Sequence, residues 1–581
     1  MRKLFPLFAY LAFLTFLFSG SLVAQTPALP QGTYAGTLQA GDAELHLLLH
    51  LSKNEDGSLR ATLDSLEQGV FAIEATAVSF SNYNLKLEVT SVGARFAGKV
   101  SPDHEIIDGE WSQGSASLPL KFHRETRGVA RKPNEAVFPV EGLWQGAIET
   151  HGMRLRFQLH IYHDPDNQLI AALDSLDQQV SGLPANHVTL KDPIFHFEIP
   201  SVAGVYEGTL NAAKNEMTGK WSQTSADNLQ LNFKRSDQTL ELRRPQTPHP
   251  PFPYREEEVS FEGGGPGVTL AGTLTLPKGN GSFPAAVLVA GSGPQDRNEA
   301  IARHQPFFVI ADALTRQGIA VLRYDKRGVG KSTGNVDVAT TMDLAADAQA
   351  ALNYLKSRKD IDTARIGLIG HSEGAIIAPY LAGKSRDVAW LVLLAAPATK
   401  GEDTLLNQSE LIGRAGGLND DQINASLEFD QVAYKLVREE KDPNVLSQKL
   451  MGLVKDSGLD AALPPAALET QLRMLMSPWF RFFLDYDPLP NLKNVKCPAL
   501  ALYGLKDLQV PAKVNAPLVK QAFEESGNKQ VQVKQLPELN HQFQHAYLGT
   551  PTEYAAIEET FSPETLTLVV DWVVGQSFPK P

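Results

Sequence analysis

The sequence predicts a multidomain protein in which two tandem all-β repeats, each a meander barrel or sandwich, precede an α/β domain. Residues 30–125 and 140–236 repeat one pattern of short alternating strands. Residues 237–253 carry five prolines, which indicates an extended linker. From residue 254 to 581, strand-like and helix-like segments alternate, as is typical of a parallel sheet covered by helices.

The two N-terminal repeats are offset by about 110 residues. The segment Ala-Thr-Leu-Asp-Ser-Leu at 61–66 recurs as Ala-Ala-Leu-Asp-Ser-Leu at 171–176, and Gly-Glu-Trp-Ser-Gln at 109–113 recurs as Gly-Lys-Trp-Ser-Gln at 219–223. Matches in one register predict an internal duplication. Each copy is predicted to contain about eight strands in meander order.

Trp111 and Trp221 stand at equivalent positions of the two repeats. They could line a carbohydrate- or lipid-binding face, or they could fill the core of each barrel. We favour packing, because equivalent positions in two copies require equivalent packing. Four histidines near the strands lack the neighbours that a metal site needs, so we predict neither a metal nor a cofactor: His46, His50, His160 and His163.

The chain has 581 residues, which corresponds to two to four domains. Its hydrophobic content of 43% and charged content of 20% are ordinary for a soluble globular protein. The formal net charge of -13 argues against nucleic acid and against an anionic membrane surface as the main partner.

Residues 1–24 are predicted to be a signal peptide. Arg2 and Lys3 precede an apolar run over residues 4–18, and Ala24 is the small residue before the expected cleavage point. An uncleaved anchor is the alternative, because the run approaches membrane-spanning length. We expect a bacterial periplasmic or secreted protein without stable membrane insertion after cleavage. The only cysteine, Cys497, precludes an intramolecular disulfide and is expected to be an inert thiol.

Residues 365–374 combine an apolar strand-like run with Gly-His-Ser-Glu-Gly, and a helix-like run follows directly. A strand, a tight turn and a helix in this order predict a nucleophile elbow with Ser372 at its tip. Gly370 and Gly374 are required because side chains there would collide across so sharp a turn. Ser372 is therefore the candidate nucleophile.

The remaining elements of the C-terminal domain follow from apolar runs and turn signals. Between the strand at 388–394 and the strand at 499–503, residues 399–494 read as a helical insertion, and we expect it to form a lid over the site. Strands are expected at 256–262, 268–276, 285–290, 320–324, 388–394, 499–503 and 531–536, and helices at 307–316, 342–355, 375–381 and 563–574.

Two further polar residues also follow strands of the same predicted sheet. Asp507 comes after the strand at 499–503, and His541 follows the strand at 531–536. Carboxyl ends of parallel strands meet at one sheet edge, so Ser372, Asp507 and His541 should converge in the chain order Ser, Asp, His. Weaker alternatives are His545 as the base and Asp485 or Asp487 as the acid, since the first lies beyond the loop and the others precede a proline in the insertion.

The C-terminal domain resembles the α/β-hydrolase superfamily, and specifically bacterial exported esterases related to the serine aminopeptidase-like branch. Asn298, where an acid is commoner, and Ala375, where glycine is commoner, depart from the pattern without touching the three candidate residues. The resemblance covers nearly the whole domain, and its motifs lie at residues 291–297, 325–332, 370–374, 504–507 and 540–541.

In the expected chemistry, His541 takes the proton of the Ser372 hydroxyl, which attacks an ester carbonyl and forms an acyl-enzyme. Asp507 fixes the tautomer of His541. The backbone N–H groups of Glu373 and Ser292 are the expected oxyanion donors. The Glu373 carboxylate could form structural hydrogen bonds or attract a substrate amine, and the sequence leaves both open.

We therefore expect a serine hydrolase, a carboxylesterase whose small-molecule substrates are short-acyl esters, as the resemblance implies. An aminopeptidase or other amide hydrolase of the same fold is the alternative within enzymes, because the same residues cleave both bonds. A surface binding or scaffold protein with an inactive hydrolase domain is the alternative from another class.

Overall fold

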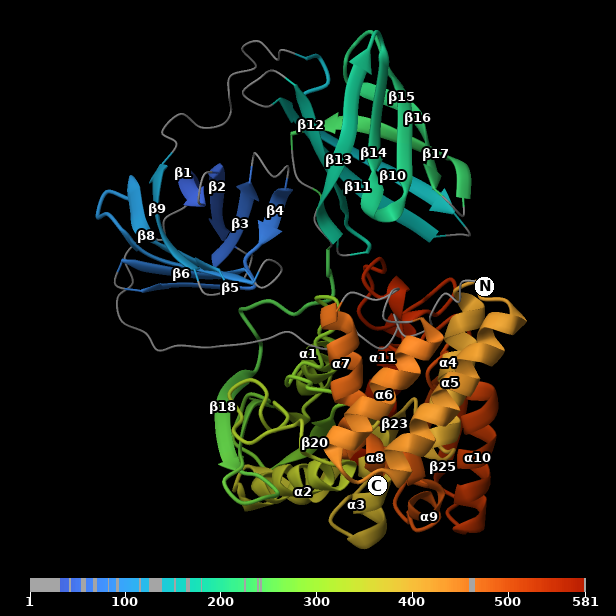
Figure 1. Cartoon of the computed structure of the whole chain (residues 1–581). Coiled ribbons are helices and arrows are strands. Elements are labelled where there is room, and N and C mark those ends of the chain that lie inside the picture. Colours follow the sequence, from blue (N-terminus) through green and yellow to red (C-terminus); the bar gives the residue numbers. More distant parts are fainter. Residues whose placement is uncertain are drawn as a thin grey trace. The chain divides into compact units, whose positions relative to one another are not determined.

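The computed structural model describes residues 32–578 apart from 41–42, 54–58, 66–69, 82, 90–92, 114–115, 125–137, 151–152, 164–167, 179, 224–225, 238–239, 241–242 and 459–464. The predicted signal peptide lies outside these residues. The chain divides between Leu242 and Arg243 into an all-β unit and an α/β unit (Figure 1). This arrangement confirms the predicted fold class.

The first β sheet has nine antiparallel strands in the order β4-β3-β2-β1-β9-β8-β7-β6-β5. Buried and exposed residues alternate along β6 and β7, so one face of the sheet forms the core. The strands are β1 (Gly32–Ala40), β2 (Ala43–Lys53), β3 (Leu59–Ser65), β4 (Val70–Glu74), β5 (Ala77–Ser81), β6 (Asn84–Val89), β7 (Ala94–Val100), β8 (Ile106–Gln113) and β9 (Ala116–Arg124).

The second β sheet closes into an eight-stranded barrel in which each strand pairs with its sequence neighbour and β10 pairs with β17. Most of its strands begin 110 residues after their counterparts in the first sheet. The strands are β10 (Gly142–Thr150), β11 (Met153–His163), β12 (Leu169–Ser175), β13 (Val180–Lys191), β14 (Ile194–Ile199), β15 (Gly204–Leu210), β16 (Glu216–Gln223) and β17 (Ala226–Ser236).

The two β sheets differ where the long strand β13 has two shorter counterparts, β4 and β5. In the first sheet the long strand is interrupted at Thr76, between β4 and β5. The N–H and the hydroxyl of Thr76 both donate to the carbonyl of Glu88. As a result, β4 and β5 are the two edge strands of the first sheet. The interruption also gives this sheet nine strands, where about eight were expected. Trp111 and Trp221 are both buried in the hydrophobic cores of their own sheets, which confirms that they pack there.

The C-terminal unit is built on an eight-stranded sheet in the order β18-β19-β21-β20-β22-β23-β24-β25. The antiparallel pair β18–β19 opens the sheet, and the pairs from β21 to β25 are parallel. The strands are β18 (Arg255–Glu262), β19 (Thr269–Leu276), β20 (Phe283–Val289), β21 (Ala320–Tyr324), β22 (Ile361–His371), β23 (Leu391–Leu394), β24 (Ala499–Gly504) and β25 (Val531–Leu536).

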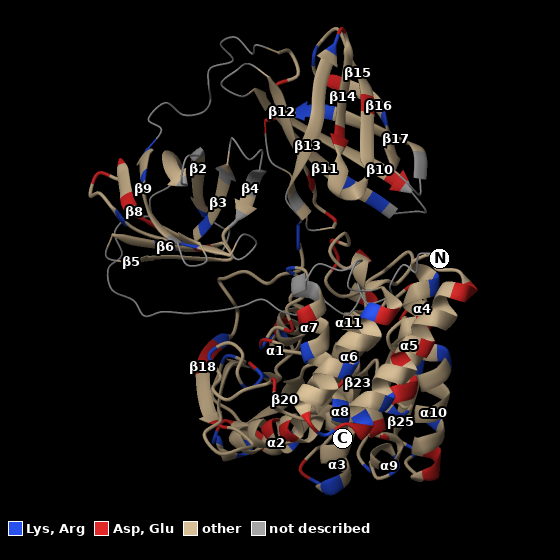
Figure 2. Cartoon of the chain, in the orientation of Figure 1, with Lys and Arg blue, Asp and Glu red and all other residues tan. Residues whose placement is uncertain are grey.

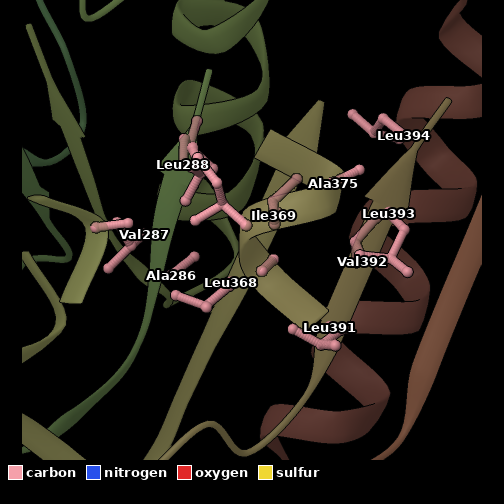
Figure 3. Packing of buried hydrophobic residues seen from close by; sticks show 14 of the residues in the cluster. Ala286, Val287, Leu288, Leu368, Ile369, Ala375, Leu391, Val392, Leu393 and Leu394 are labelled. Atoms are coloured by element: carbon pink, nitrogen blue, oxygen red, sulfur yellow. The ribbon is translucent and has the colours of Figure 1, made fainter. Parts of the chain in front are cut away.

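Strands β23 and β24 of this sheet are buried along their whole length and β20 is buried after its first residue, as expected for a sheet covered on both faces. Figure 3 shows side chains of β20, β22 and β23 meeting within one hydrophobic cluster. The helices that follow individual strands are α1 (Pro306–Arg316), α2 (Thr341–Ser357), α3 (Gly374–Lys384), α10 (Ala512–Glu525) and α11 (Pro563–Ser577). Cys497, just before β24, is half-buried, and burial raises the pKa of its thiol to about 11.

A helical insertion lies between β23 and β24, as the sequence predicted. Its hydrophobic core includes Phe480 and Phe483 and extends to Ile376 of α3, so the insertion packs on the helix that follows the elbow. Acidic and basic side chains occur along the same helices (Figure 2). The helices are α4 (Gly401–Ala415), α5 (Asp420–Glu439), α6 (Pro443–Ser457), α7 (Pro465–Met476), α8 (Pro478–Asp485) and α9 (Leu489–Leu492). No helix among the described residues is long and apolar enough to span a membrane.

Asp430 of α5 is buried in this insertion, where its carboxylate accepts a hydrogen bond of 2.6 Å from Ser409 of α4. Burial raises its pKa to about 6 from an ordinary value of 3.8. Compared with the unfolded chain, the folded chain therefore binds the proton of Asp430 more tightly. The cost of ionising Asp430 grows as pH rises from about 4 to about 6 and is complete above that range.

We therefore expect Asp430→Asn to raise the melting temperature of the C-terminal unit at pH 8 and to change it little at pH 4. The free energy of unfolding at pH 8 should rise by at most about 3 kcal/mol, since the carboxamide keeps an acceptor for Ser409 without the charge. Calorimetry at both pH values measures it. Glu439→Gln, which neutralises an exposed acid on the same helix, is the control. An equal gain at pH 4 would contradict the assignment to ionisation.

Candidate active site

The predicted elbow is present where β22 meets α3. β22 ends at His371, Ser372 adopts φ +53°, and α3 begins at Gly374. Positive φ is costly for a residue with a side chain, so the surrounding structure must hold Ser372 in place. The Ser372 N–H donates to the carbonyl of Leu394, at the end of β23, over 2.9 Å. The tip of the turn is thus tied to the neighbouring strand.

The two glycines of the elbow are required by contact distances. A Cβ at Gly370 would lie 2.2 Å from the carbonyl oxygen of Gly374, and a Cβ at Gly374 would lie 1.9 Å from the carbonyl oxygen of Val289. Both distances are far below van der Waals contact, and both partners are backbone atoms that cannot rotate away. The elbow therefore admits only glycine at these positions.

Asp507 and His541, predicted as acid and base, are in contact. His541 Nδ1 lies 2.8 Å from Asp507 Oδ2, and both side chains are buried. The other carboxylate oxygen, Oδ1, accepts the N–H groups of Gln509 and Val510, each at 2.8 Å. Three donors therefore fix the carboxylate, and the geometry places the Nδ1 proton of His541 against Oδ2.

The loop that carries His541 is shaped by Asn540. The Asn540 side-chain oxygen accepts the N–H groups of Gln542 and Gln544, each at 3.0 Å, which closes a tight turn around His541. Gly504 at the end of β24 lets this loop approach, because a Cβ there would lie 2.2 Å from the carbonyl oxygen of Leu539. Sequence analysis did not anticipate either role.

Ser372 and His541 line one cavity of about 330 Å³. Among the described residues Ser372 Oγ makes no hydrogen bond, which is common before substrate binds, since catalytic hydrogen bonds often tighten only in the complex. Helices α4, α7 and α8 of the insertion form much of the wall. Apolar side chains from the insertion and from the neighbouring α3 line the cavity: Ile376, Leu405, Met474, Trp479, Phe480 and Phe483.

The predicted oxyanion donors border the same cavity as Ser372. In the described part of the chain, neither the N–H of Ser292 nor that of Glu373 donates to a protein acceptor. The carbonyl of Ser292 accepts from Gln295 Nε2 at 3.1 Å, and Arg297 forms an ion pair of 2.8 Å with Asp325. These contacts brace the loop after β20 and leave the N–H of Ser292 available to a ligand.

The Glu373 carboxylate, whose role the sequence left open, forms structural hydrogen bonds. It is buried and accepts from Lys326 Nζ at 3.1 Å, Thr341 Oγ1 at 2.7 Å and Trp479 Nε1 at 2.5 Å. Lys326 also donates to the carbonyl of Gly291. Glu373 therefore connects the elbow with α2 and with α8 of the insertion. Through Lys326, in the loop after β21, it also connects the elbow with the loop after β20.

The weaker alternatives lie away from the cavity walls. His545 is half-exposed and pairs with Glu559 at 2.9 Å. Asp485 pairs with Arg438, and Asp487 accepts the N–H of Leu489. The structure thus brings Asp507 and His541 together beside Ser372, and it brings none of these alternatives there. Within the described ranges, no three histidine, cysteine or acidic side chains are grouped so that they could hold a metal ion.

One polar pair behind the elbow, between Glu299 and His371, was not predicted from the sequence. His371 Nδ1 lies 2.9 Å from Glu299 Oε1, and His371 Nε2 lies 3.0 Å from the carbonyl oxygen of His541. Glu299 and His371 are both buried and 72 residues apart in sequence. The only sign of this pair in the sequence is a histidine next to the nucleophile, and the sequence does not indicate which residue that histidine contacts.

Comparisons with known proteins concern mainly the C-terminal unit. Residues 298–419 match the serine aminopeptidase S33 family. The chain is 30% identical over 305 residues to esterase EstD of Thermotoga maritima, covering 52% of this chain and 64% of EstD. It is 39% identical over 127 residues to an uncharacterized protein of Mycobacterium tuberculosis, covering 22% of this chain and 41% of that protein. The alignments thus span less than two thirds of either relative.

A solved esterase structure from Pyrococcus furiosus aligns with 49% of this chain and 83% of that chain, at 19% identity and a TM-score of 0.33. The family match, the similarity to EstD, and a parallel sheet interrupted by a helical insertion after its sixth strand agree with one another. The C-terminal unit of this chain thus has an α/β-hydrolase architecture and is similar to the serine aminopeptidase-like hydrolases.

Proposed function

We propose that this chain is a serine carboxylesterase that cleaves short-acyl esters through an acyl-enzyme on Ser372. The observation that carries the proposal is the meeting of Ser372 with the Asp507–His541 pair at one largely apolar cavity. His541 takes the proton of the Ser372 hydroxyl as it attacks the ester carbonyl, and then returns it to the leaving alcohol. Water attacks the acyl-enzyme in the second half of the reaction.

The N–H groups of Ser292 and Glu373 stabilise the oxyanion in this proposal. Each borders the cavity beside Ser372 and lacks a protein acceptor among the described residues. Loss of one such donor typically costs about 3–4 kcal/mol in the transition state. The similarity to an esterase of Thermotoga maritima supports the choice of an ester substrate.

The Glu373 carboxylate bears on the choice between esters and amino-terminal amides. An aminopeptidase needs an anionic group for the substrate ammonium, and Glu373 is the carboxylate nearest in sequence to Ser372. Its oxygens already accept from Lys326, Thr341 and Trp479, so it has a cation of its own. Glu299 is likewise engaged with His371. Both observations favour an ester.

Aminopeptidase activity is the second candidate, because residues 298–419 match the serine aminopeptidase S33 family. Asp337 is an exposed carboxylate on the cavity wall and is the candidate partner for a substrate amine. Asp337→Asn would then weaken binding of aminoacyl substrates and leave simple esters unaffected.

A substrate profile distinguishes the two activities. We expect the full-length chain to hydrolyse p-nitrophenyl acetate and butyrate with a higher kcat/KM than any aminoacyl p-nitroanilide, since the apolar wall accepts an acyl chain and the buried carboxylates described on it, Glu299 and Glu373, already have partners. Steady-state kinetics over acyl lengths from two to twelve carbons checks this. Anilide hydrolysis at rates that match the esters would reverse the assignment.

The proposal extends to the rest of the chain. The sequence of residues 1–24 supports export to a bacterial periplasm or beyond. The common offset of 110 residues in both sequence motifs and strand bounds supports duplication of one β unit. A small-molecule ester is the proposed partner, and the net charge of -13 argues against nucleic acid.

A further inference from the structure

The loop after β20 and the loop after β25 both lie beside Ser372. The Glu299–His371 pair joins these two loops to the elbow. The carbonyl oxygen of His541, in the loop after β25, is 3.0 Å from His371 Nε2. The N–H of Gly291, in the loop after β20, donates to Glu299 Oε1 over 2.5 Å. Glu299 and His371 meet at 2.9 Å. A continuous chain of hydrogen bonds thus runs from the loop of the expected base to the loop of the expected oxyanion donor.

The protonation of His371 follows from its partners. A backbone carbonyl can only accept, so Nε2 must carry a proton. At the other nitrogen, Glu299 Oε1 already accepts the N–H of Gly291, and an ionised carboxylate can only accept, so this oxygen accepts from Nδ1 as well. With two acceptors, the ring holds two protons and is an imidazolium paired with a carboxylate.

The surroundings are consistent with a net-neutral buried pair. Both side chains are about 95% buried, and an isolated charge there would be costly. The titratable groups facing the His371 ring are Glu299, the His541 ring at 4.8 Å between centroids, and Asp507 behind it. Burial lowers the pKa of His371, but Glu299, the His541 carbonyl and Asp507 together raise it above its ordinary value.

We propose that Glu299 and His371 form a carboxylate–imidazolium pair that positions the His541 loop and the Gly291–Ser292 loop around Ser372. This inference rests on the proposed function. Neither residue reacts with substrate: they are positioning residues, and the pair works only while it keeps its proton. Deprotonation leaves a carboxylate facing a ring lone pair, which loosens both loops at once.

Glu299→Gln tests the pair, and Glu559→Gln is the matched control, because Glu559 forms an exposed contact of the same kind with His545. We expect Glu299→Gln to lower kcat for p-nitrophenyl acetate by about 10²-fold with little change in KM, as a small misplacement of catalytic groups does. Glu559→Gln should retain wild-type kcat. Wild-type kcat should also fall as pH rises through the raised pKa of His371.

The pH profile separates positioning from a merely structural role. The glutamine amide donates to a neutral His371, so the variant should lose the alkaline decline of kcat that the wild type shows. Unchanged kcat, or a reduced kcat with the wild-type alkaline decline retained, would overturn the proposal.

Nitrogen-15 NMR of histidine-labelled wild type provides a measurement that does not depend on a folded variant or on turnover. Both ring nitrogens of His371 should be protonated at neutral pH, and a neutral ring would overturn the proposal. Failure of the proposed function appears separately, as a wild-type chain without ester hydrolysis.

Discussion

Ser372→Ala is expected to lower ester turnover by up to about 10⁶-fold, the loss seen when a triad loses its nucleophile. Replacing the hydroxyl removes the atom that forms the acyl-enzyme, while the cavity and both oxyanion donors stay in place. A residual acceleration over water of about 10³–10⁴ is therefore expected. The measurement is kcat for p-nitrophenyl butyrate in the full-length chain.

The control for this variant is Ser385→Ala, which removes a hydroxyl at the C-terminal end of the helix that Ser372 precedes. A fluorophosphonate probe should label the wild type and Ser385→Ala once per chain and leave Ser372→Ala unlabelled. Wild-type turnover by Ser372→Ala would exclude it as the nucleophile. A wild type that neither turns over esters nor takes the probe would favour the binding or scaffold function.

Asp507→Asn is expected to lower kcat by about 10⁴-fold, as the corresponding change does in other triads. The two backbone donors on Oδ1 determine the outcome. The N–H groups of Gln509 and Val510 hold the carbonyl oxygen of the new asparagine, which turns its amide nitrogen toward His541 Nδ1. The ring then keeps its proton on Nε2 and cannot accept one from Ser372.

Asp487→Asn is the control for this change, because Asp487 was one of the two other acids considered and its carboxylate accepts the backbone N–H of Leu489. It should retain kcat within about twofold, the range of surface substitutions away from the site. Kinetics and circular dichroism of both variants give the comparison. Equal losses in the two variants would argue against Asp507 as the acid.

Much of the site was predictable, because parallel sheets place functional residues where strands end. Ser372 and Asp507 each follow an apolar run, His541 follows a strand of alternating apolar and polar residues, and a turn signal marks each strand end. The strand at 499–503 and the helix at 563–574 were found within one to three residues of their observed bounds. Local patterns were sufficient for these features.

Most of the missed features depend on pairing between distant residues. Glu299 meets His371, and Glu373 meets Trp479, across separations of 72 and 106 residues. Buried polar side chains satisfy each other wherever the fold brings them, and sequence spacing carries no record of the partner. The break at Thr76 is similar, since its acceptor lies on another strand.

The single cysteine makes the full-length chain suited to site-specific labelling. Maleimides react with the thiolate, and the half-buried Cys497 has a pKa of about 11, so its thiolate is scarce at neutral pH. A thiol introduced on the exposed side of α6, by Val445→Cys, would react selectively while the native residue stays in place. A fluorophore there would report movement of the insertion during turnover.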